Sequence, residues 1–163
     1  MVPALPNRPS VTRRTILTWL GLGLAMVTID SASATTATGM DVAHGRFIHV
    51  DPSDTLHWGR GSVIVRREGN RQSVEFGDDF AVAAGPDLVV YLVERAEVRS
   101  AEDFLTGGAL AIGPLKATTG RQRYEVPDDV PLEAVGSVVI WCRSVGVLFS
   151  PARLAHRSAR TGG

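Results

Sequence analysis

Two short stretches of the chain are apolar at nearly every position, a pattern typical of strands that are buried on both faces. The first spans residues 87–93 and reads DLVVYLV. The second spans residues 138–142, reads VVIWC, and begins the longest apolar run of this part of the chain, residues 138–154. We interpret 138–154 as the central hairpin of a β domain.

Alternation along a strand assigns the residues of this hairpin to two faces, because successive side chains point in opposite directions. Val138, Ile140 and Cys142 share one face, and Val139 and Trp141 share the other. Both faces are apolar. We therefore expect Cys142 to be a buried thiol, and the local pattern alone is more typical of a small core residue than of a reactive group.

Other strands are predicted at intervals of 8 to 12 residues. They span residues 46–50, 62–67, 71–76, 110–115 and 122–126. Glu68-Gly69-Asn70 predicts a tight hairpin loop, and Ser100 is typical of the cap of a short helical turn. No long amphipathic helix is predicted. The fold class is therefore all-β, an antiparallel β-sandwich or partly closed barrel of roughly eight to ten short strands.

The N-terminal segment is typical of an export signal rather than of a domain. Arg13-Arg14 precede a weakly apolar segment, 16–29, which is too short for an ordinary membrane span of about 20 residues. Ala32 and Ala34 fit a cleavage site. We expect a twin-arginine-type signal peptide over 1–34, with an uncleaved anchor or a general secretory signal as the alternatives.

These assignments give the rest of the chain three parts: a linker over 35–42, a β domain over 43–154 and a flexible tail over 155–163. The protein is then exported, to the periplasm, the cell surface or the medium, and meets the membrane only transiently through its signal. His156 falls in the tail and is expected to be solvated.

Composition excludes several functions. Lys+Arg and Asp+Glu are both 17 in the 163 residues, so no excess of positive charge indicates a nucleic-acid partner. One cysteine excludes an internal disulfide, a CxxC redox motif and a four-thiolate zinc site. The sequence also lacks the GxSxG, HExxH and phosphate-loop motifs of common enzyme classes.

Five motifs follow one another in a specific order and spacing. They are His57-Trp58-Gly59-Arg60-Gly61, Gly85-Pro86-Asp87-Leu88, Gly113-Pro114-Leu115-Lys116, the segment 120–127 (GRQRYEVP) and Val138-Val139-Ile140-Trp141-Cys142. In this order the chain resembles the DM-thirteen domain family, labelled an electron-transfer domain, over residues 45–154. The resemblance implies an extracellular β-rich domain with a redox role for the cysteine at position 142. Val145 stands where the family tends to have an aromatic residue.

The glycines and the aspartate of these motifs also have a structural explanation. Gly59, Gly61, Gly85 and Gly120 are expected in turns with positive φ, and Asp87 is expected to accept hydrogen bonds from loop amides.

The candidate site is centred on Cys142, with His57, Trp141 and Asp87 as candidate binding residues. His57 lies in a glycine-flanked loop that we expect near the end of the Cys142 strand, where imidazole and thiolate would suit copper or iron. No cofactor or metal is specified by the spacing. Burial raises the pKa of a thiol, so we expect a cation such as His57 or Arg60 to be needed for its activation.

Two functions follow. The first is an exported redox or electron-transfer domain centred on Cys142, with another redox protein as partner. The alternative is a non-catalytic extracytoplasmic β-domain that binds a protein or cell-wall component, with Cys142 buried and inert. The sequence leaves it uncertain whether the protein is an enzyme.

Overall fold

The computed structural model describes residues 39–157. The signal peptide predicted over 1–34 lies outside the described residues. Nine strands, one short α-helix and one 3-10 helix make up the described domain, and their bounds are β1 Met40–Phe47, β2 Gly59–Glu68, β3 Arg71–Phe76, β4 Ala81–Val82, β5 Leu88–Val93, α1 Ala101–Leu105, β6 Ala109–Pro114, β7 Gln122–Val126, η1 Leu132–Ala134, β8 Ser137–Cys142 and β9 Val147–His156.

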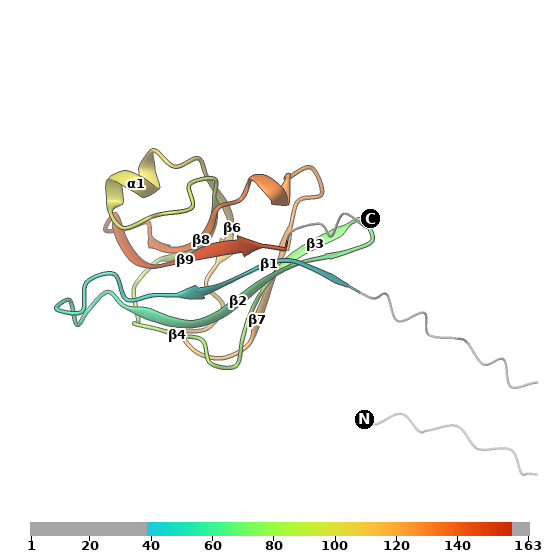
Figure 1. Ribbon diagram of the computed structural model, residues 1–163. Helices are drawn as coiled ribbons and strands as arrows, with labels where there is room; N and C mark the ends of the chain where they lie inside the picture. Colours follow the sequence, from blue (N-terminus) through green and yellow to red (C-terminus); the bar gives the residue numbers. More distant parts are fainter. Residues whose placement is uncertain (1–38, 158–163) are drawn as a thin grey trace, which may run out of the picture. The chain divides into compact units, whose positions relative to one another are not determined.

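The strands form one antiparallel sheet that curls into a nearly closed barrel (Figure 1). Their order is β6-β5-β8-β9-β1-β2-β3-β7, with β4 paired to β2. The two end strands approach each other near one point, where the backbone N–H of Lys116 donates to the Tyr124 hydroxyl at 3.0 Å. The predicted fold class, an antiparallel β-sandwich or partly closed barrel, is confirmed.

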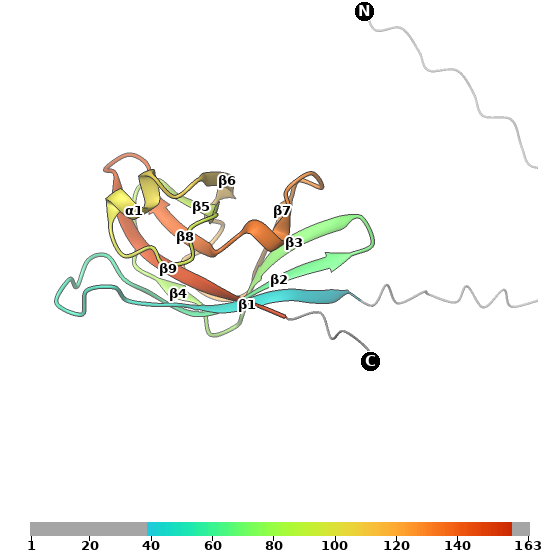
Figure 2. The same cartoon turned by 45° about the horizontal axis from the view of Figure 1, so that its top comes forward.

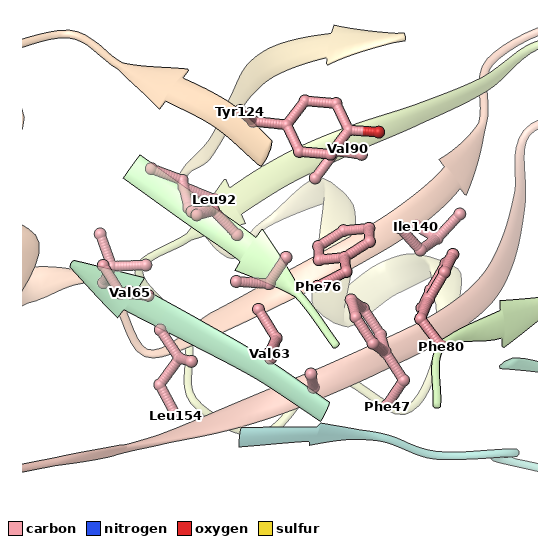
Figure 3. Packing of buried hydrophobic residues seen from close by; sticks show 14 of the residues in the cluster. Phe47, Val63, Val65, Phe76, Phe80, Val90, Leu92, Tyr124, Ile140 and Leu154 are labelled. Atoms are coloured by element: carbon pink, nitrogen blue, oxygen red, sulfur yellow. The ribbon is translucent and has the colours of Figure 1, made fainter. Parts of the chain in front are cut away.

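The barrel interior holds the main hydrophobic core. Three phenylalanine rings from different segments meet there, with ring centroids 4.9 Å apart for Phe47 and Phe76 and 4.5 Å apart for Phe76 and Phe80 (Figure 3). Val138, Ile140 and Cys142 belong to this cluster, as the alternation predicts. Aromatic pairs in such edge-on or tilted contact contribute beyond their buried area.

A second, smaller apolar layer lies on the outer face of β8 and explains why this strand is apolar on both sides. Val139 and Trp141 pack there with Phe104 from α1. The ribbon of α1 lies beside the β8–β9 part of the sheet in both views (Figures 1 and 2). Ser100 caps the helix by accepting a hydrogen bond from the backbone N–H of Asp103, as predicted. Within residues 39–157, no helix has the length and apolar character to cross a membrane.

The ends of the domain differ from the sequence-based boundaries. β1 begins at Met40, inside the predicted linker, and ends at Phe47, because it pairs with both β2 and β9. β9 continues two residues past the predicted end at Leu154. His156 therefore lies in a strand rather than in the predicted tail. It is exposed to solvent, as expected, and its Nε2 atom lies 2.7 Å from the carbonyl oxygen of Val135.

Candidate functional site

Cys142 is the last residue of β8, and its side chain is fully buried (0% exposed). It faces the barrel interior beside Leu88, its neighbour across the β5–β8 ladder. The turn that covers it, residues 143–146, is exposed at every position. The buried thiol therefore lies at the end of the core where the exposed turn and the start of β5 meet.

A neighbouring hydroxyl and nearby backbone groups form hydrogen bonds with the sulfur. The Ser144 hydroxyl oxygen lies 3.4 Å from Sγ. Burial raises the pKa of the Cys142 thiol, but hydrogen bonding from the Ser144 side chain and from the backbone of Asp87, Val145 and Ser144 outweighs burial. The net effect is a pKa below the ordinary value for cysteine, which favours the reactive thiolate.

This mechanism of activation differs from the predicted one, which required a cation. Arg143 follows Cys142 directly, but its guanidinium is directed to the Asp87 carboxylate, with Nε–Oδ2 and Nη2–Oδ1 distances of 3.1 and 3.2 Å. The side chain of Asp87 therefore accepts from Arg143 rather than from loop amides. Arg143 also donates its backbone N–H to the Asp87 carbonyl at 3.0 Å. The contacts between Arg143 and Asp87 therefore hold in place the backbone of Asp87, which forms a hydrogen bond with the Cys142 sulfur.

His57 lies at the rim of the barrel, beside the strand that follows the cysteine turn. Its ring packs edge-on against Phe149 of β9, with centroids 5.0 Å apart, and its Nδ1 atom lies 2.7 Å from Oδ2 of Asp54. The hydrogen bond from His57 is the largest of several that hold the pKa of Asp54 below its ordinary value. Hydrogen bonding to Sγ comes from residues 87, 144 and 145 rather than from His57.

Trp141 is next to Cys142 in sequence but on the opposite face of β8. Its indole is 6% exposed and stacks on Phe104, with centroids 4.2 Å apart and an interplanar angle of 17°. The structure therefore places Cys142 and Asp87 together, and places Trp141 in the second apolar layer under α1.

Ser144, whose hydroxyl contacts the sulfur, was missed from the sequence. Its position two residues after the cysteine, in a turn ended by Gly146 with φ of 66°, was the available signal. Among the described side chains, no group of three or more His, Cys, Asp or Glu residues is arranged to hold a metal ion.

The comparisons with known proteins agree with this geometry. The family model described as Electron transfer DM13 matches residues 51–154, well over half of the 163-residue chain, and includes every element from β2 to β8. Comparison with curated proteins and with solved structures gave no match. The chain therefore belongs to the DM13 family of electron-transfer domains.

Proposed function

We propose that this protein is an exported redox domain in which Cys142 is the group that reacts. The observation that carries the proposal is the set of hydrogen-bond donors around the sulfur, from Ser144, Val145 and Asp87, which lowers the thiol pKa despite complete burial. A core cysteine in apolar surroundings has the opposite shift. Membership of an electron-transfer family supports a role in the same chemical class.

A single cysteine determines how such a domain exchanges electrons by thiol chemistry. Because the chain has no second thiol, it cannot form an internal disulfide, so the exchange needs a second molecule, for which we propose another redox protein. The Cys142 thiolate attacks one sulfur of a partner disulfide, the partner's S–S bond breaks, and a mixed disulfide forms. The other partner sulfur leaves as a thiolate and takes up the proton that Cys142 released. Cys142 is thereby oxidised and the partner sulfur reduced.

Access to the sulfur requires movement of the covering turn, residues 143–146. These four residues are exposed, and a backbone bond from the N–H of Gly146 to the carbonyl of Cys142 closes the turn at 2.9 Å. Short surface turns open at far lower free energy than a barrel core does. Local opening therefore gives a partner access to Cys142 without unfolding of β8.

The direct test is the pH dependence of Cys142 alkylation in the folded full-length protein. The rate of reaction with iodoacetamide is expected to rise with a midpoint below that of an unperturbed thiol. Ser144→Ala removes the side-chain hydrogen bond that lowers the thiol pKa, so it should raise this midpoint. Ser53→Ala is the matched control, because that hydroxyl donates to the Asp51 carboxylate and not to the sulfur.

Two results would contradict the redox proposal. One is a thiol that reacts only at denaturant concentrations that unfold the whole domain. The other is an alkylation midpoint that Ser144→Ala leaves unchanged. Either result favours the alternative, a non-catalytic β-domain that binds a protein or wall component. Metal analysis and an absorption spectrum of the same sample test whether the thiolate is a ligand of a bound metal or chromophore.

Export has a separate test on the full chain. Replacing Arg13 and Arg14 together with lysine should leave the precursor in the cytoplasm of the exporting host, because twin-arginine recognition depends on both guanidinium groups. Cell fractionation and immunoblotting measure the distribution. Normal export of the double-lysine variant would show that another route carries the protein.

A further inference from the structure

A hollow of about 190 Å³ lies at the end of β5 that is far from the cysteine turn, between the start of β6 and the loop that precedes β8. Its wall is mainly apolar and includes Leu92, Leu110, Val130 and Val135. β6 is an end strand of the sheet and pairs only with β5, so this side of the hollow is not covered by another strand. Leu110 is 42% exposed there.

Two acidic residues, Glu94 and Asp129, complete the lining. The carboxyl group of Glu94 lies against Gly108, where a Cβ atom would come within 3.0 Å of Glu94 Cδ and Oε2. Glycine at position 108 therefore leaves room for this carboxylate at the mouth of the hollow.

Neighbouring cations do not neutralise these two acids. Arg95 pairs with Asp103 at 3.6 Å, Arg67 with Glu133 at 3.1 Å and Arg153 with Glu97 at 2.7 Å. No ion pair among residues 39–157 includes Glu94 or Asp129. The hollow thus combines an apolar wall with negative charge that has no protein counterion in the described part of the chain.

We propose that this hollow binds a small organic ammonium compound. A compact aliphatic body would replace water along Leu92, Leu110 and Val135, and the ammonium group would face the carboxylates at the mouth. Small-molecule sites typically combine an apolar wall with a few polar groups that fix orientation. The two carboxylates then select for cationic ligands, because they would repel an anion of the same shape. The proposal concerns a site that is separate from Cys142 and does not depend on its redox role.

The test is a titration of the ¹⁵N-labelled full chain with isobutylammonium, followed by amide chemical shifts. Isobutanol and isobutyrate, which keep the same body with no charge or the opposite charge, are the matched probes. We expect shifts at the amides of Glu94, Gly108 and Leu110 with isobutylammonium, and much weaker or no shifts with the other two. Glu94→Gln and Asp129→Asn should each weaken binding by about threefold, the range of a solvent-exposed charge pair.

Two pairs of variants separate binding from stability. Leu110→Arg places a cation at the mouth and should abolish binding, whereas Leu105→Arg, at a 71% exposed position on α1, should not. Glu102→Gln, on the same helix, is the control for Glu94→Gln. Equal shifts with isobutanol, unchanged affinity in the Glu94 and Asp129 variants, or no shift at these amides would each overturn the proposal.

Discussion

Replacing Trp141 with alanine is expected to lower the free energy of unfolding by about 3–5 kcal/mol, the usual cost of removing a large buried aromatic side chain. The indole is 6% exposed and stacks on Phe104, and the second apolar layer is formed around this contact. Its loss removes the stacked partner of Phe104, which then keeps only an edge-on ring contact with Tyr91, with centroids 5.0 Å apart. Because small domains are stable by only about 5–15 kcal/mol, this change removes a large part of the total.

Urea unfolding followed by far-ultraviolet circular dichroism measures this loss, since fluorescence would change with the removed indole itself. Leu105→Ala is the control on α1, and its 71% exposed side chain should change stability by less than about 0.5 kcal/mol. Trp141→Phe keeps a ring against Phe104 and should lie between the two. A loss below about 1 kcal/mol for Trp141→Ala would show that the layer under α1 contributes little.

The same variant tests whether the second apolar layer influences Cys142. Trp141 and Cys142 are adjacent in the chain, but their side chains lie in different clusters on opposite faces of β8. In the absence of urea, Trp141→Ala should therefore leave the pH midpoint of Cys142 alkylation unchanged. A shifted midpoint would mean that the two faces of β8 are coupled.

Much of the fold was predictable because it depends on local pattern. Alternation placed Val138 and Ile140 on the core face, and the apolar run at 88–93 correctly indicated a second strand covered on both sides. The loop Glu68-Gly69-Asn70 and the cap at Ser100 were likewise local signals. These features are decided by residues a few positions apart, which is the range over which sequence patterns are informative.

The position of β1 was not predictable for the opposite reason. His44 and Gly45 lie outside the apolar run expected at 46–50, yet they form a strand because β2 and β9 offer hydrogen-bonding edges on both sides. Backbone pairing with segments far along the chain, at Ile64 and Leu154 for example, determined the secondary structure there. Tertiary context of this kind overrides local propensity in strands.

The candidate site was predicted only in part. The sequence identified Cys142 and its burial, but the groups that act on its sulfur come from the end of β5 and from a turn whose shape depends on the hairpin. Asp87 contributes through its backbone, for which side-chain identity gives no signal. From the sequence we therefore expected a cation to lower the pKa of the Cys142 thiol, whereas in the structure hydrogen bonds lower it.

Glycines illustrate a similar limit. Positive φ was predicted correctly at Gly61 and Gly120 but wrongly at Gly59 and Gly85. Glycine is needed at Gly59 and Gly85 because a neighbouring side chain leaves no room for a Cβ atom. A Cβ at Gly59 would lie 2.5 Å from Cβ of Ser150, and one at Gly85 would lie 2.8 Å from Cζ of Phe149. Turn chemistry can be inferred from neighbouring residues, whereas close approach between distant segments cannot.

Gly61 combines both requirements, so its replacement by alanine is expected to be among the most damaging single-methyl changes in the barrel. Its φ is 112°, and a Cβ would lie 2.4 Å from Cα and 2.6 Å from the backbone nitrogen of Phe80. These are backbone atoms, so no rotamer change can relieve the clash. The segment that would have to move carries the Phe80 ring, which packs against Phe47 and Phe76 in the core (Figure 3).

We expect Gly61→Ala to lower the free energy of unfolding by about 4 kcal/mol, from backbone strain and overpacking together. Gly69→Ala is the matched control, because Gly69 also has positive φ, at 62°, but a Cβ there would meet no atom within 4 Å. The control should lose only about 1 kcal/mol, the cost of the left-handed conformation alone. Parallel urea titrations of the two variants isolate the clash as the difference between them. Equal losses would mean that the turn before Phe80 moves aside freely, and that Gly61 is needed for its backbone conformation and not for the contact between β2 and Phe80.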